Sequence, residues 1–78
     1  SSVNGELRQS SNTSLFLNSI QEVLEELTAA MTLLPGTIIA TGTPAGVGMG
    51  FDPPRFLKPG DVVTCAIEGI GTLTNPVV

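Results

Sequence analysis

The longest stretch of this chain without a charged residue runs from position 27 to 51, and prolines and glycines interrupt it. A membrane-spanning helix needs about 20 consecutive, mostly apolar residues. Pro35 and Pro44 each lack the backbone N–H that a helix interior uses, so no helix continues through this stretch. The chain therefore has to fold as short elements joined by turns, and we expect no membrane partner.

Few stabilising devices are open to a chain of 78 residues. A domain of this size buries only about 60% of the surface that its unfolded chain exposes. Cys65 is the single cysteine and histidine is absent, so neither an intramolecular disulfide nor a Cys/His zinc site can form. A single cysteine favours a reducing compartment, and we expect an intracellular protein, cytoplasmic or mitochondrial.

The net charge of −4 comes from seven acidic and three basic residues. The bases Arg8, Arg55 and Lys58 are scattered along the sequence, and both Tyr and Trp are absent. Proteins that bind nucleic acids neutralise the phosphates with clustered Lys and Arg and stack bases on aromatic rings. The composition therefore argues against a nucleic-acid partner.

The pair Asn4-Gly5 predicts a β-hairpin, because both residues tolerate the positive φ that a two-residue turn requires. The outgoing strand covers positions 6–9, but only three residues precede the turn. A hairpin with one short arm favours a chain that begins inside a sheet. The alternative is a frayed terminus in which the Asn-Gly pair occurs by chance.

A helix is predicted from about Ile20 to Ala30. Ser19 and Glu22 match a capping box, in which each side chain bonds the backbone N–H of the other residue. Pro35-Gly36 excludes a longer helix. The glutamates of this segment form a solvated face rather than a paired-carboxylate site. Apolar residues recur at helical spacing and predict a face that packs in the core: Ile20, Val23, Leu24, Leu27 and Met31.

The second half of the chain predicts strands. The β-branched run at 37–41 indicates a buried strand, and Pro59-Gly60 predicts a turn before an alternating strand at 61–68. Cys65 lies in that strand without a histidine to activate it, so we expect a buried structural thiol rather than a nucleophile. A last strand ends at Pro76, which confines it to an edge or a bulge.

These elements together predict an α+β, β-rich fold, a mixed sheet with one helix. The apolar faces need more partner surface than the chain itself supplies, which favours a piece of a larger domain.

The loop "ATGTPAGVGMG" at 40–50 admits three interpretations. A phosphate-binding loop at Gly46 to Gly50 would need a helix directly after the glycines, and Pro53-Pro54 prevents one. Alternatively, Thr41 and Thr43 contact a ligand through their hydroxyls, and Gly42 lets it approach the backbone. In the third interpretation these threonines bond their own backbone in a structural turn.

Four segments of the chain resemble the fumarylacetoacetate hydrolase family and occur in the family's order. Thr-Gly-Thr-Pro-x-Gly-Val-Gly at 41–48, followed by Leu-Lys-Pro-Gly-Asp at 57–61, is specific in combination. Family members are longer, so the resemblance implies that residues 1–78 form the C-terminal part of a catalytic domain. The matching segments are "VNGELRQSSNTS", "MTLLPG", "ATGTPAGVGMG" and "PPRFLKPGDVV" with "IEGIGTLTNPVV".

The resemblance implies a metal-dependent enzyme that hydrolyses, decarboxylates or isomerises β-diketo or oxo acids of the acylpyruvate or oxaloacetate type. Carboxylates would hold Mg²⁺ or Mn²⁺, but these ligands and the family's His/Glu pair lie before the matched part. The resemblance thus places no catalytic residue and no metal ligand on this chain. It carries over Thr43 as a substrate contact, assisted by Gly42.

The expected partners are the remainder of the parent domain and a small oxo-acid substrate, in a parent that is a homodimer. We expect the chain alone to be inactive. The competing interpretation is a non-catalytic, β-rich interaction module.

Overall fold

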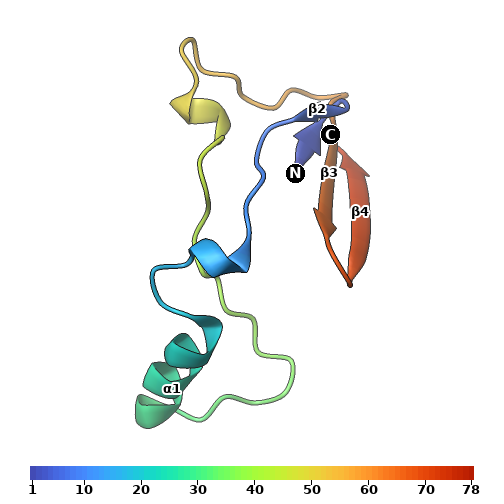
Figure 1. Ribbon diagram of the computed structural model, residues 1–78. Helices are drawn as coiled ribbons and strands as arrows, with labels where there is room; N and C mark the ends of the chain where they lie inside the picture. The colour runs from blue at the N-terminus through green and yellow to red at the C-terminus, as the bar shows by residue number, and fades with distance from the viewer. The chain divides into compact units, whose positions relative to one another are not determined.

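The computed structural model describes residues 1–78 and divides them into two compact units. The first unit comprises Ser1–Ser10 and Pro44–Val78, and the second comprises Ser11–Thr43. The strands lie in the first unit and the α-helix lies in the second (Figure 1).

A four-stranded sheet forms the first unit, with the strand order β2-β1-β3-β4. All three strand pairs are antiparallel, so the α+β, β-rich fold is confirmed but the sheet is antiparallel rather than mixed. Hairpin turns join β1 to β2 and β3 to β4, which makes these two pairs antiparallel. The strands are β1 Ser2–Val3, β2 Glu6–Leu7, β3 Val62–Ile67 and β4 Gly71–Pro76.

The predicted hairpin at Asn4-Gly5 is confirmed. Val3 pairs with Glu6, and the two turn residues have φ of 51° and 80°. Val3 also pairs with Val63 on β3, so the first residues form an inner strand rather than a frayed end. Val3 is the only buried hydrophobic side chain in the chain, 8% exposed, and marks where the small core lies.

Two turns fix the position of β3. In the first, the Asp61 amide donates to the Lys58 carbonyl at 3.0 Å, and Gly60 has the positive φ that the sequence predicted. In the second, Ile67 pairs with Gly71 across a three-residue connection that leads into β4. β4 is an edge strand, as the proline at its end predicted.

The helix α1 covers Ile20–Ala30, as predicted. The Ser19 hydroxyl oxygen accepts from the Glu22 amide at 3.1 Å, which is the first half of the capping box. The Glu22 carboxylate accepts from the Ser19 hydroxyl at 3.2 Å, where a full capping box would engage the Ser19 amide. The three glutamates of α1 are exposed, as expected. No helix of the structure is long and apolar enough to cross a membrane.

The predicted strand at 37–41 is wrong. These residues form no strand, and Ile38 is 93% exposed. A strand needs a neighbour that accepts its backbone hydrogen bonds, and no strand of the sheet pairs with residues 37–41. Thr37 instead closes a turn, because its amide and its hydroxyl both donate to the Leu34 carbonyl, at 3.1 and 2.7 Å.

The predicted core face of α1 is not buried within this chain. Ile20 and Met31 are 49% and 53% exposed, Leu24 is also exposed, and Val23 and Leu27 are half-buried. Because apolar surface is driven out of water, a helix with this pattern requires a covering layer. The shortage of partner surface that the sequence predicted is therefore present in the structure.

Candidate functional site

The loop at 44–50 is held against two backbone segments of the first unit. A Cβ added at Gly46 would overlap the carbonyl oxygen of Arg8, and Gly46 also has φ of 108°. A Cβ added at Gly48 would overlap the carbonyl oxygen of Arg55, whose own amide donates to the Gly48 carbonyl at 2.7 Å. These two glycines therefore serve close backbone packing.

The same loop offers no helix for a phosphate. Gly48–Gly50 forms a single 3-10 turn, η2, and the chain continues as bends and coil up to Pro59. A nucleotide loop places its phosphate at the N-terminus of the helix that follows. The loop at Gly46 to Gly50 thus lacks the element that phosphate binding requires.

The Gln9 side chain anchors the start of this loop. Its amide nitrogen Nε2 donates to the carbonyl oxygen of Pro44 at 3.0 Å, across 35 positions of sequence. Pro44 directly follows Thr43, one of the two predicted substrate-contact residues. Gln9 could not be predicted from the sequence, because nothing in its local pattern indicates a partner so far along the chain.

Gly42 and Thr43 belong to the second unit and are exposed. Gly42 has φ of 99°, a conformation that favours glycine, and a Cβ added there would meet no atom within 4 Å. Open space beside a glycine backbone is what a closely approaching ligand requires. The role of both residues in binding a substrate stays a prediction.

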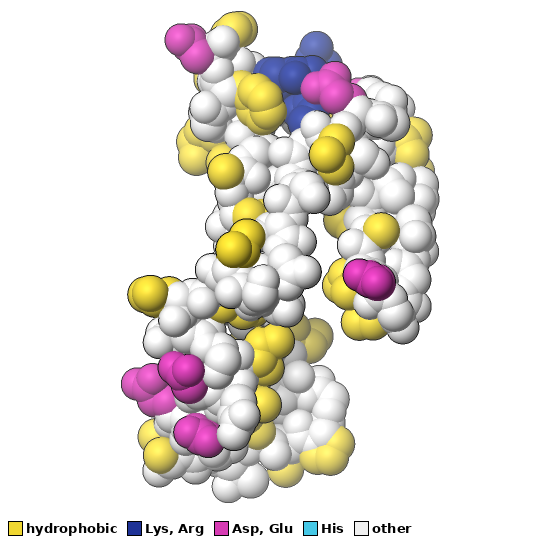
Figure 2. Space-filling view, in the orientation of Figure 1, with side chains coloured by type: hydrophobic (Ala, Val, Ile, Leu, Met, Phe, Trp, Pro, Cys, Tyr) yellow, Lys and Arg dark blue, Asp and Glu magenta, His cyan; other side chains and the backbone are white.

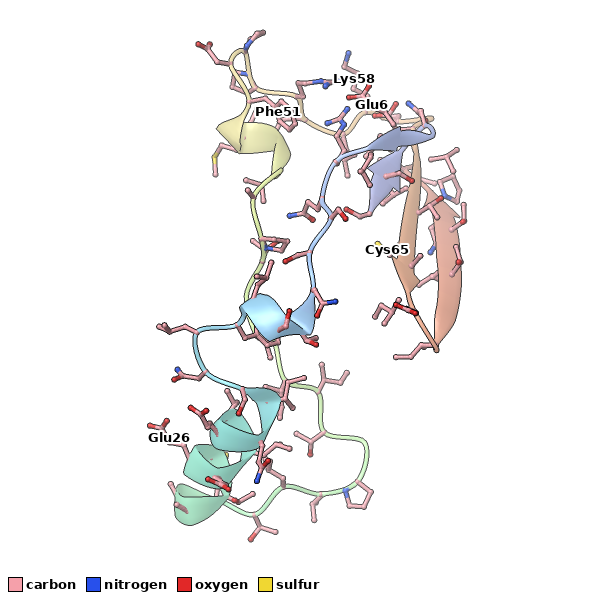
Figure 3. The ribbon with its side chains drawn as sticks, viewed as in Figure 1. Glu6, Glu26, Phe51, Lys58 and Cys65 are labelled. Atoms are coloured by element: carbon pink, nitrogen blue, oxygen red, sulfur yellow. The ribbon has the colours of Figure 1, made fainter.

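An ion-pair cluster forms where the sequence indicated only scattered charges. Arg55 makes two bonds to the Glu6 carboxylate, from Nη1 at 2.6 Å and from Nη2 at 3.0 Å, and Arg8 Nε lies 3.4 Å from the same carboxylate. Both guanidinium groups lie over the Phe51 ring, 5.4 and 5.2 Å from its centre. Figure 2 shows the Lys and Arg side chains gathered in one place beside an acidic one, and Figure 3 labels Glu6 and Phe51.

This cluster has a clear electrostatic effect. The hydrogen bond from Arg55 lowers the pKa of Glu6 below its ordinary value, and the same bond raises the pKa of Arg55. The carboxylate is therefore held ionised and occupied by two cations. Such a group is a structural tie rather than a general base, because a base has to accept a proton near neutral pH.

A cavity of about 350 Å³ opens beside β3 in the first unit. Cys65 projects from β3 and lines it, and the thiol is exposed, so the prediction of a buried cysteine is wrong (Figure 3). The prediction failed because the segments that face this side of β3 leave a cavity there instead of packing against the thiol. Five apolar side chains also line it: Val3, Val47, Phe56, Leu57 and Val63.

Comparison with known proteins decides the family. A family model described as fumarylacetoacetate (FAA) hydrolase C-terminal matches residues 1–78. The chain belongs to the fumarylacetoacetate hydrolase family.

Several proteins of this family are similar to the chain. Oxaloacetate tautomerase YisK of Bacillus subtilis is 56% identical over 75 residues, which are 96% of this chain and 25% of that protein. An uncharacterized protein of Staphylococcus haemolyticus is 55% identical over 73 residues, 94% of this chain and 24% of its own length. The chain thus spans about a quarter of the length of these curated relatives.

Solved structures of the family share the fold. The fumarylacetoacetate hydrolase of Exiguobacterium antarcticum superposes with a TM-score of 0.89 at 56% identity, over 96% of this chain and 27% of that one. A probable 2-hydroxyhepta-2,4-diene-1,7-dioate isomerase of Mycobacterium abscessus superposes with a TM-score of 0.85 at 46% identity, over 95% of this chain and 28% of that one. The α+β arrangement of this chain is therefore that of the family's C-terminal fold.

The resemblance to fumarylacetoacetate hydrolases implied a divalent metal ion, and the chain's own acidic residues do not fit one. No group of three or more His, Cys, Asp or Glu side chains that could hold a metal ion occurs in the structure. The Glu6 carboxylate is committed to Arg55. Asp61 accepts from the Asn4 side chain at 2.9 Å and from the Lys58 amide at 2.9 Å. Both carboxylates are thus committed within the fold.

Proposed function

We propose that this chain is the C-terminal segment of a metal-dependent enzyme acting on β-diketo or oxo acids of the acylpyruvate or oxaloacetate type. Membership of the fumarylacetoacetate hydrolase family over all of residues 1–78 carries this proposal. The names of two similar proteins support the substrate class, since one is an oxaloacetate tautomerase and the other a probable isomerase of an unsaturated hydroxy diacid. Hydrolysis, decarboxylation and isomerisation all proceed from such acids.

In this proposal the loop at 41–44 forms one wall of the substrate site. The Thr43 hydroxyl donates a hydrogen bond to a carboxylate or carbonyl oxygen of the acid, and Gly42 allows the acid to approach the backbone. The open space around Gly42 and its positive φ support this role. No catalytic residue is assigned to the chain.

The remaining groups come from the parent protein. Mg²⁺ or Mn²⁺ would be held by carboxylates outside this chain and would supply charge for the substrate oxygens. The remainder of the parent domain would cover the apolar stripe of α1 and the cavity beside β3, both of which are open here. We further propose that the parent is a homodimer.

The test is Thr43→Val in the complete protein, assayed with oxaloacetate and with an acylpyruvate in the presence of Mg²⁺. Loss of a hydrogen bond to a charged substrate lowers kcat/KM by roughly 10- to 100-fold. The matched control is Thr72→Val, because Thr72 is exposed on β4, where valine suits a strand. Its kinetics are expected to be unchanged.

Two outcomes would contradict the proposal at different points. Unchanged kinetics in Thr43→Val would remove the role given to Thr43 and leave the reaction class intact. A complete protein that turns over neither acid with Mg²⁺ would remove the reaction class itself. Saturable binding to a protein partner would then favour the non-catalytic interaction module.

A further inference from the structure

We infer that Gln9 is a positioning residue for the substrate loop, an inference that rests on the proposed function. Its Nε2 donates to the Pro44 carbonyl oxygen at 3.0 Å. Because Pro44 is bonded directly to Thr43, fixing the Pro44 carbonyl restricts the backbone on which the Thr43 hydroxyl is carried. Gln9 therefore acts on the substrate through Pro44.

The Pro44 carbonyl depends on a side chain for its partner. Proline has no backbone N–H, so the carbonyl oxygen is the only hydrogen-bonding group on the Pro44 main chain. Farther along the loop, close packing at Gly46 and the bond from the Arg55 amide to the Gly48 carbonyl hold the backbone. The Gln9 bond thus holds the residue that directly follows Thr43.

The orientation of the Gln9 amide follows from its two neighbours. The Ser1 hydroxyl donates to Gln9 Oε1 at 3.3 Å, which places the amide oxygen on that side. The Pro44 carbonyl can only accept, so it must face the amide nitrogen. The Gln9 backbone amide also donates to the Ser1 carbonyl at 3.2 Å, which extends the β1–β2 hairpin to the anchor.

Close backbone packing brings the two segments together at the same point. The Cβ position at Gly46 lies 2.9 Å from Gln9 Cγ, in addition to its overlap with the Arg8 carbonyl. Glycine at position 46 thus lets the loop approach close enough for the Gln9 side chain to reach Pro44. The hairpin that starts at Asn4-Gly5 is thus in contact with the loop at Pro44 and Gly46.

The test is Gln9→Glu in the complete protein, assayed with the acids and Mg²⁺ used for Thr43. Glutamate has the length of glutamine, but at neutral pH it presents a second acceptor to the Pro44 carbonyl. We expect kcat/KM to fall roughly 3- to 10-fold relative to wild type, the range for one lost neutral hydrogen bond. The ratio to wild type should recover as the pH approaches about 4, because a protonated carboxyl group donates again.

Two further variants separate positioning from general damage. Gln9→Met has a similar length and no donor, so it should show the same deficit at neutral pH without recovery at low pH. Gln21→Glu is the matched control, since Gln21 lies exposed on α1 and donates only to Glu25 at 3.4 Å. Its kcat/KM should equal that of wild type at every pH.

Hydrogen exchange of the peptide covering positions 43–48 gives a readout that does not depend on turnover. Exchange should accelerate in Gln9→Glu and Gln9→Met at neutral pH and stay unchanged in Gln21→Glu. Kinetics and exchange in Gln9→Glu that match Gln21→Glu would overturn the inference, as would faster exchange with unchanged kcat/KM. A wild-type protein that turns over neither acid would instead overturn the proposed function. If exchange in its Gln9 variants also equals that of wild type, the anchoring role of Gln9 would be overturned as well.

Discussion

The side-chain hydrogen bonds within the first unit span much longer sequence separations than those of α1 and its neighbouring turns in the second unit. In the first unit, side-chain bonds join Asn4 to Asp61 and Val62, and Arg55 to Glu6, across 49 to 58 positions of sequence. In the second unit, the side-chain bonds of α1, its Ser19 cap and the neighbouring turns join residues two to four positions apart. The sheet therefore depends on distant parts of this chain, whereas the helix is specified locally and has no partner here for its apolar stripe.

The largest expected difference in the free energy of unfolding is between substitutions of two glycines with similar φ, Gly46 in the first unit and Gly42 in the second. Gly46→Ala should lower the free energy of unfolding of the complete protein by about 3–5 kcal/mol, because the new Cβ overlaps the Arg8 carbonyl and adds strain at positive φ. Gly42→Ala adds strain alone and should cost about 1–3 kcal/mol. Urea denaturation measures both changes, and equal losses would contradict the packing assigned to Gly46.

A smaller difference in the free energy of unfolding is expected between substitutions of one polar residue in each unit, Asn4 in the first and Ser19 in the second. Asn4→Ala should cost about 2–3 kcal/mol, because it removes bonds to Asp61 and to the Val62 amide and places alanine at φ of 51°. Ser19→Ala removes only the helix cap and should cost about 1 kcal/mol.

Thermal denaturation of the two variants in the complete protein measures this contrast. A larger loss in Ser19→Ala than in Asn4→Ala would show that the helix, and not the hairpin, is the more strongly supported element.

The smallest expected effect is a pH dependence in the first unit. Bonds from the Asn4 side chain and the Lys58 amide lower the pKa of Asp61, and Arg55 lowers that of Glu6. A lowered pKa in the folded state contributes stability above the unfolded pKa, near 4, and that stability is lost as the pH falls through the folded pKa.

The melting temperatures of wild type and Asp61→Asn test this dependence. Wild type should melt higher at pH 7, and the difference should shrink below about pH 4. Glu26→Gln is the control, because Glu26 is exposed on α1 (Figure 3). A difference for Asp61→Asn that is as large at pH 3 as at pH 7 would contradict the assigned cause.

Elements whose signal is local in the sequence could be predicted. The Asn4-Gly5 turn, the Ser19 cap and the Pro59-Gly60 turn depend on residues within four positions of each other, so their patterns can be read directly. The strand predicted at 37–41 and the burial predicted for Cys65 were wrong, because β-branched composition and alternation indicate burial only where a second layer is available.

The residues of the candidate site also differ in whether the sequence could indicate them. Gly42 and Thr43 stay predictions, made from the residues of the loop and from the resemblance to a family, which samples the constraints of the whole protein. Gln9 and the cluster around Glu6 were not found, because each depends on a contact across 35 to 49 positions. Only the folded chain brings those residues together.

Close packing at Gly46 and Gly48 also limits how this loop can vary. An added side chain at either position overlaps a neighbouring carbonyl, whereas one at Gly50 meets only the Val47 methyl at an ordinary distance of 3.6 Å. Between the two restricted glycines and beyond them, Val47 and Met49 are 42% and 72% exposed. Substitutions that alter the chemistry of the loop without disturbing its backbone are thus easiest at Val47 and Met49, and a change at Val47 also alters the wall of the cavity beside β3.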